Sequence, residues 1–204
     1  IIEAQIRGFD LKILNKRYDE IDTSILKNSY KDIEKLVVGS LDKVNASKLS
    51  KSRIPVHSFF NDLEHQLKDQ MLERQVDFEI SINNNILKDF SLFASRELLL
   101  TVFDNLSNNS LKALSTIENP KIKLEVTYHE IKREYIIFFS DNGVGISSDN
   151  IVSLFTLWSS GTNGTGIGLS ASRDIIEDMG GTISYVDRED TGYKTTFMIK
   201  LPRR

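Results

Sequence analysis

The stretch that decides the fold is Asn105-Leu106-Ser107-Asn108-Asn109-Ser110-Leu111-Lys112, which lies late in an apolar run with helical spacing. A second segment, Asp141-Asn142-Gly143-Val144-Gly145-Ile146, follows directly on a β-rich run. A third, Gly164-Thr165-Gly166-Ile167-Gly168-Leu169, opens another helical pattern. Each segment alone is a weak signal, so the three have to be interpreted together.

The first segment carries two amides and a lysine at helical spacing. Asn105, Asn109 and Lys112 are four and three residues apart, which places them on one helix face. Amide groups can coordinate Mg²⁺ or contact phosphate, and a lysine supplies a point charge for a polyphosphate. The alternative is an ordinary polar face turned to solvent, and the residues alone leave both open.

The second segment places a carboxylate at the end of a predicted strand. Asp141 can accept a hydrogen bond from an adenine amino group there, and Gly143 and Gly145 let the backbone approach a base closely. The alternative is a hairpin turn, for which Asp-Asn-Gly is a common signal. No strand pattern follows, because Ser147-Ser148-Asp149 indicates a helix start.

The third segment combines glycines with a helix N-terminus. Backbone N–H groups at such a terminus, approached through glycine, bind phosphate. The alternation of Gly164, Gly166 and Gly168 is also found in dinucleotide-binding folds. That interpretation fails on context, because no strand leads into these glycines and no βαβ unit surrounds them.

The remaining pattern predicts an α+β domain, with helices on one face of a mixed, mostly antiparallel sheet. Ser95 is a plausible N-cap for the helix that carries the first segment, and Asn119-Pro120 ends it. The other predicted elements are a helix near 59–72, strands at 76–82, 121–131 and 134–140, a helix at 167–179, and a last hairpin at 182–187 and 193–201.

Residues 1–52 read as a helical segment and 53–204 as the second domain. Apolar residues recur every three or four positions in two sets, Ile2, Ile6, Phe9 and Ile13, then Leu26, Tyr30, Ile33, Val37, Leu41 and Val44. This narrow stripe needs a partner surface, either its own domain or a dimerising helical bundle. The polar Ser50–Arg53 stretch predicts the boundary.

Composition bounds the function classes. The 204 residues carry a formal net charge of −3, with 40% hydrophobic and 27% charged residues, so the chain can build a core. This charge gives no general case for nucleic acid, and we expect no such partner. The chain has no cysteine, which excludes disulfides and thiolate metal sites.

No apolar run approaches the roughly 20 residues of a membrane span. We therefore expect no membrane contact within this chain and a cytoplasmic location. The chain begins Ile1-Ile2-Glu3, without a basic leader or a Met. We expect it to be part of a longer protein, with any membrane anchor or sensor domain upstream.

The three segments together resemble the N, G1 and G2 boxes of the Bergerat ATP-binding fold, which histidine kinases share with gyrase B and Hsp90. The resemblance covers about 54–202, and it is strongest to the catalytic domain of a sensor histidine kinase. It implies bound ATP and Mg²⁺, with Asn109 on the metal and Asn105 and Lys112 in catalytic roles. The nucleotide-binding residues that it implies are Asn105, Asn109, Lys112, Asp141, Gly143, Gly145, Ile146, Phe155, Thr165, Gly166, Ile167, Gly168, Leu169 and Thr196.

Within that set, the resemblance gives each part of the site a role. Asp141 reads adenine, the loop from Thr165 contacts the triphosphate, and Phe155 opens an ATP lid and packs on the domain. Thr196 is the threonine expected near the adenine. Two positions depart from the family pattern: Ser110 stands where a small apolar residue is usual, and Lys194 where a second glycine is common.

Position 105 separates the members of the superfamily. ATP-hydrolysing relatives and serine kinases place a glutamate four residues before the metal-binding Asn, as a general base. An amide cannot take a proton, so the sequence favours transfer of the γ-phosphoryl group to histidine, which is nucleophilic when neutral. The alternatives are a Bergerat-fold ATPase, a nucleotide-dependent switch module, or a degenerate binding scaffold without turnover.

The phosphoacceptor is not evident in this chain. In this family the acceptor histidine is normally followed by an acidic residue and then Pro, and His57, His65 and His129 all lack this context. The acceptor is therefore expected upstream of Ile1 or on a partner. The resemblance further implies a homodimer through the N-terminal helices and a response regulator as partner.

Overall fold

The computed structural model describes residues 51–156, 168–188 and 192–203. The helical segment predicted at residues 1–52 lies outside this part of the chain, except for Lys51 and Ser52. Its organisation and its boundary with the second domain stay predictions.

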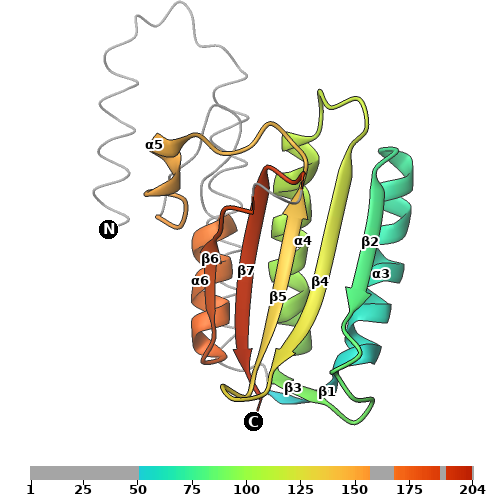
Figure 1. The fold of residues 1–204 in the computed structure, drawn as a ribbon, viewed down its shortest axis with the longest axis vertical. Helices are drawn as coiled ribbons and strands as arrows, with labels where there is room; N and C mark the ends of the chain where they lie inside the picture. The colour runs from blue at the N-terminus through green and yellow to red at the C-terminus, as the bar shows by residue number, and fades with distance from the viewer. Residues whose placement is uncertain (1–50, 157–167, 189–191, 204) are drawn as a thin grey trace, which may run out of the picture. The chain divides into compact units, whose positions relative to one another are not determined.

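The domain is a five-stranded sheet with helices on one face (Figure 1). The strand order is β2-β4-β5-β7-β6; β2 and β4 are parallel, and the other neighbours are antiparallel. The strands are β2 (Asp77–Ile82), β4 (Lys121–His129), β5 (Glu134–Asp141), β6 (Thr182–Tyr185) and β7 (Thr195–Pro202). The predicted fold class, helices on one face of a mixed and mostly antiparallel sheet, is confirmed.

Helices α3 (Val56–Glu73), α4 (Arg96–Ala113) and α6 (Gly168–Asp178) lie behind the sheet in Figure 1. A single-turn helix, α5 (Ser148–Ile151), follows the turn after β5. Strands β1 (Ser52–Pro55) and β3 (Ser91–Ala94) form a separate antiparallel pair. The sequence does not indicate β3, which is four residues long and pairs with a strand far away along the chain.

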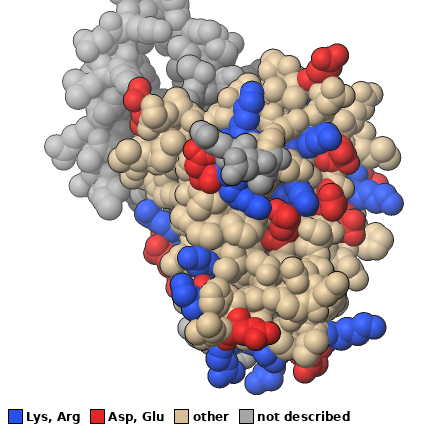
Figure 2. Space-filling view, in the orientation of Figure 1, with Lys and Arg blue, Asp and Glu red and all other residues tan. Residues whose placement is uncertain are grey.

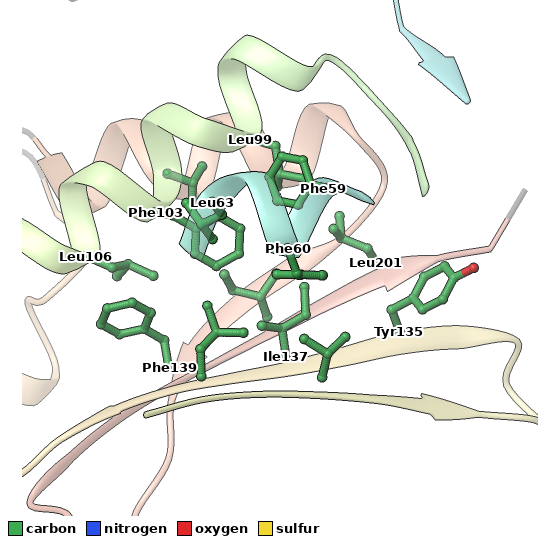
Figure 3. Packing of buried hydrophobic residues seen from close by; sticks show 14 of the residues in the cluster. Phe59, Phe60, Leu63, Leu99, Phe103, Leu106, Tyr135, Ile137, Phe139 and Leu201 are labelled. Carbon is green, nitrogen blue, oxygen red and sulfur yellow. The ribbon is translucent and has the colours of Figure 1, made fainter. Parts of the chain in front are cut away.

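Alternation along the central strands builds the core. Every second residue of β5 (Tyr135, Ile137 and Phe139) is fully buried under the helices. Helices α3 and α4 cover them with Phe59, Phe60 and Phe103, whose ring centroids lie 5.2–6.0 Å apart (Figure 3). Burying each such side chain contributes about 1.5–3 kcal/mol, so this cluster fixes α3 and α4 on the sheet.

Helix α4 begins where the sequence predicts and ends earlier. The Ser95 hydroxyl accepts a hydrogen bond from the Leu98 N–H, as expected of an N-cap. The helix ends at Ala113 rather than near Ile117. The Ala113 carbonyl accepts the Val144 N–H, 3.1 Å away, in the turn after β5, while Ile117 donates to the Leu114 carbonyl in a tighter turn.

The sheet face opposite the helices is mixed in charge (Figure 2). Arg188 pairs with Glu125 of β4 at 2.8 Å, and its guanidinium carbon lies 4.5 Å from the ring centroid of Phe138. Long charged side chains thus cover apolar residues on this face. In the part of the chain described here, no helix is long and apolar enough to cross a bilayer.

Candidate functional site

Four elements meet at one end of the sheet: the last turns of α4, the end of β5, the first turn of α6 and the start of β7. Asp141 closes β5 and lies opposite Thr195, the first residue of β7. Asn105 of α4 contacts Gly168, the first residue of α6. The topology therefore brings the first two predicted segments and Gly168 of the third together at the carboxyl end of the central strand.

Asp141 is the centre of a buried hydrogen-bond cluster. Its side chain is 2% exposed. The Ser110 hydroxyl donates to its Oδ2 at 2.6 Å, and the Gly143 N–H donates to its Oδ1 at 2.9 Å. The Thr195 side chain also hydrogen-bonds to it. These contacts fix the carboxyl in one orientation.

The same hydrogen bonds oppose the effect of burial on the pKa of the Asp141 carboxyl. Burial raises the pKa of Asp141 above its ordinary value of 3.8, and the three hydrogen bonds lower it. Each neighbour donates, so each favours the ionised form. An ionised, oriented carboxylate offers acceptors only, and its complement on a ligand is an N–H donor.

The turn after β5 requires its glycines. A Cβ at Gly143 would lie 2.8 Å from the Ala113 Cβ and 2.9 Å from the Ala113 carbonyl oxygen. Gly145 has a φ of +80°, in the left-handed region. The chain then enters α5 rather than a returning strand, so the hairpin alternative for Asp-Asn-Gly is wrong. Ile146 is partly buried against the core.

The polar face of α4 is joined to α6 through Asn105. Its Nδ2 donates to the Gly168 carbonyl and to the Ser172 hydroxyl, both at 3.3 Å. Ser172 is fully buried, and its hydroxyl also donates to the Gly168 carbonyl at 2.9 Å. The Asn105 amide is therefore engaged with the first turn of α6, and the alternative of a merely solvated face does not describe it.

Asn109 and Lys112 follow on the same side of α4, half-buried and exposed respectively. Mg²⁺ usually keeps several waters and takes few protein ligands, so a single amide oxygen beside phosphates fits its requirements. The half-buried Asn109 side chain, four residues from the helix contact made by Asn105, has this chemistry. Lys112 lies in the last turn of α4 and can reach out as a point charge.

Phe155 packs on the domain, as the sequence predicts. Its ring lies edge-on to Phe197 of β7, with centroids 6.2 Å apart. Leu169 of α6 is partly buried against the core. The predicted ligands Thr165, Gly166 and Ile167 lie outside the described residues, and so does the part of the predicted lid that follows residue 156.

The threonine opposite Asp141 is Thr195, whereas Thr196, which the sequence predicts near the adenine, lies opposite Ser140. Successive residues of a strand point to opposite faces. Thr195 shares the helix-covered face with Asp141, whereas Thr196 is paired with Ser140 on the other face, their hydroxyl oxygens 3.0 Å apart. A shift of one residue along a strand therefore places a side chain on the opposite face of the sheet.

Ser110 is part of this cluster, although the sequence did not predict it as a site residue. A signal was present, because Ser107 and Ser110 fall on the buried face of α4, between the apolar positions that pack on the sheet. A serine in a helix core is unusual unless its hydroxyl has a partner. Ser110 has one in Asp141.

The two carboxylates nearest to Asn105 along α4 are engaged elsewhere. Asp104 accepts a hydrogen bond from Gln66 of α3 at 3.1 Å, and burial raises its pKa while that bond lowers it. Glu97 accepts from the Ser95 hydroxyl at 3.1 Å, at the other end of the helix. Neither is directed to the junction of Asn105 and α6.

Comparisons with known proteins agree with this geometry. A sequence model of the family described as histidine kinase-, DNA gyrase B-, and HSP90-like ATPase matches residues 94–204. Sensor protein SrrB of Staphylococcus aureus (strain NCTC 8325 / PS 47) is 31% identical over 107 residues, which cover 49% of this chain and 18% of that protein. The relative is thus much longer than the matched region.

Solved structures share the fold. The catalytic domain of histidine kinase ThkA, in a nucleotide-free form, has a TM-score of 0.63 at 25% identity, covering 76% of this chain and 97% of that one. ThkA in complex with the response regulator protein TrrA has a TM-score of 0.64 at 21% identity, covering 98% of this chain and 57% of that one. The second likeness concerns the fold alone.

The family match spans more than half of the chain and includes every element that meets at Asp141. The chain therefore belongs to the histidine kinase-, DNA gyrase B-, and HSP90-like ATPase family, and its described domain is an ATP-binding domain of the histidine kinase type.

Proposed function

We propose that this chain is the catalytic core of a two-component sensor histidine kinase, which binds Mg-ATP and transfers the γ-phosphoryl group to a histidine. The observation that carries this proposal is Asn105. Its amide stands where a hydrolase needs a carboxylate, and it is hydrogen-bonded to α6. Since Asp104 and Glu97 of α4 are engaged elsewhere, the described part of the site offers no base beside Asn105, which suits an acceptor that needs little activation.

In this proposal Asp141 accepts the adenine amino hydrogen, and Thr195 stands beside it. Gly143 and Gly145 let the backbone approach the base, with Ile146 and Phe155 flanking it. Asn109 supplies the one protein oxygen to Mg²⁺, and Lys112, exposed in the last turn of α4, neutralises phosphate charge. Asn105 acts by positioning the first turn of α6.

The triphosphate would lie at the N-terminus of α6. Backbone N–H groups there are unpaired within the helix and favour anions. Thr165, Gly166 and Ile167 belong to this part of the proposal, together with Gly168 and Leu169. Catalysis would consist of positioning and charge neutralisation, because phosphoryl transfer asks little covalent chemistry of the protein.

The acceptor histidine is proposed to lie upstream of Ile1 or on a partner chain. His57 Nε2 lies 3.0 Å from the Ile86 carbonyl oxygen, and His129 Nδ1 accepts the Lys132 N–H at 3.3 Å. These local contacts suit structural roles. We also propose a homodimer through the N-terminal helices and a response regulator as the onward acceptor, in the cytoplasm.

The test uses γ-labelled ATP with Mg²⁺, on this chain mixed with a longer version of the protein extended before Ile1. Acid-labile, base-stable label on the longer protein, with little free phosphate, is the expected result. Rapid phosphate release without label would contradict the proposal and favour an ATPase or a switch module. ATP binding with neither signal would favour a scaffold.

A further inference from the structure

Two serines on the buried face of α4 have different surroundings. Ser107 is 0% exposed, and its hydroxyl has no hydrogen-bond partner among the described residues. Ser110, one turn later, is 2% exposed and lies 2.6 Å from Asp141 Oδ2. Because the two serines lie on the same helix and are both buried, comparing them shows what the hydroxyl of Ser110 contributes.

The Ser110 hydroxyl is committed to Asp141. A helical serine commonly donates back to a carbonyl of the preceding turn. Ser110 instead donates its single proton across to β5. A distance of 2.6 Å is in the range of charge-assisted O–H···O⁻ bonds. The contact therefore favours an ionised Asp141.

These contacts leave the Asp141 carboxylate few free acceptor positions for hydrogen bonds. An ionised Asp has about four acceptor positions on its two oxygens. Ser110, the Gly143 N–H and Thr195 fill three of them. These groups come from α4, the turn after β5 and the start of β7, and none is charged. Lys194, the residue before β7, has an exposed side chain, and its backbone N–H donates to the Asp141 carbonyl at 2.9 Å.

We propose that Ser110 is a specificity-determining positioning residue, which holds Asp141 as a hydrogen-bond acceptor so that the site takes 6-aminopurine nucleotides and disfavours 6-oxopurines. The inference rests on the proposed function, in which Asp141 reads the base. A 6-amino group donates to the one remaining acceptor position. A 6-oxo group in the same place would set a second acceptor against the carboxylate, and protonation of Asp141 would relieve that repulsion.

The test compares Ser110→Ala with the matched control Ser107→Ala, each in the full chain. Equilibrium binding is measured for ATP and for inosine triphosphate, which differ at the 6-position of the base. Ser110→Ala should lower ATP affinity about tenfold and leave inosine triphosphate affinity unchanged or higher. The pH below which ATP binding weakens should move upward, because a bond favouring the anion is gone. Ser107→Ala should match wild type in all three readouts.

The outcomes separate this inference from the proposed function. If wild type binds ATP and Ser110→Ala keeps its ATP preference, the inference fails alone. Equal losses for both nucleotides would show a merely structural role and would also overturn it. If wild type binds neither nucleotide, the proposed function fails and takes the inference with it. Ser110→Thr, which retains the hydroxyl, should keep the preference and guards against a folding defect in the alanine variant.

Discussion

Asp141 accepts hydrogen bonds from Ser110, Gly143 and Thr195, and a neutral isostere tests its role in binding. Asp141→Asn keeps the shape but replaces one carboxylate oxygen with an NH₂ group. Losing a hydrogen bond to a charged acceptor should weaken ATP binding about 10- to 100-fold. Titration calorimetry measures the effect, and Asp149→Asn, an exposed acid of α5, is the control. Unchanged affinity in Asp141→Asn would remove the adenine assignment.

The same carboxyl makes stability depend on pH. Burial raises the pKa of Asp141 above 3.8, so the folded chain binds this proton more tightly than the unfolded chain. Its contribution to the free energy of unfolding is therefore full below pH 3.8 and is lost as the pH rises through the folded pKa.

Asp141→Asn removes this dependence. Relative to wild type, the variant should gain stability as the pH rises from about 4 toward neutrality. Urea unfolding at a series of pH values measures the difference, again with Asp149→Asn as control. A constant difference between Asp141→Asn and wild type across that range would show that the folded pKa is not raised.

At the scale of elements, the junction of α4 and α6 depends on the buried hydroxyl of Ser172. It accepts from Asn105 Nδ2 and donates to the Gly168 carbonyl. Ser172→Ala should lower the free energy of unfolding by about 1 kcal/mol. It should also weaken ATP and inosine triphosphate equally, by about 3- to 10-fold, because the proposed phosphate end of the site moves and the base end does not.

Adenosine distinguishes the two ends of the site in this variant. It lacks phosphates, so Ser172→Ala should bind it as wild type does. Competition with a fluorescent nucleotide measures the affinities for ATP, inosine triphosphate and adenosine in the same assay. Ser107→Ala is the control on α4. An adenosine loss as large as the ATP loss would show that α6 supports the base end instead.

The elements also show what a sequence can and cannot reveal. Periodicity located α4, β4 and β5 because their apolar spacing is long and regular. It missed β3, whose four residues form a strand only through pairing with β1. It placed the end of α4 too late, because a contact with Val144, distant in sequence, takes the Ala113 carbonyl.

The candidate site likewise contains residues that the sequence points to and residues that it does not. Asn105, Asp141 and Gly143 are recognisable because their types and spacing carry the chemistry. The sequence points to Thr196, and the neighbour Thr195 lies opposite Asp141, since strand register is a property of the pairing with β5 and not of β7 alone. Ser110 was visible as a departure, but its meaning required the 2.6 Å contact across two elements.

At the scale of the whole domain, protection should differ between the two ends of the site. Strand β5 lies between β4 and β7 and is covered by α4, so its amides should exchange with D₂O only on global unfolding. Adding ATP should slow the β5 amides only by the amount that it raises the free energy of global unfolding, and it should also slow the amides in the first turn of α6. Hydrogen exchange read by mass spectrometry tests this, with ATP that lacks Mg²⁺ as a comparison. Faster exchange in β5 than in α6 would contradict it.

The place of Asp141 at the end of that central strand has a consequence for recognition. The carboxyl is oriented by contacts that form when the domain folds, before any nucleotide arrives. Little conformational entropy remains to be lost at the base end upon binding, so the site there is preorganised. Discrimination between bases is then an equilibrium property of the folded domain itself, independent of whatever closes over the phosphates.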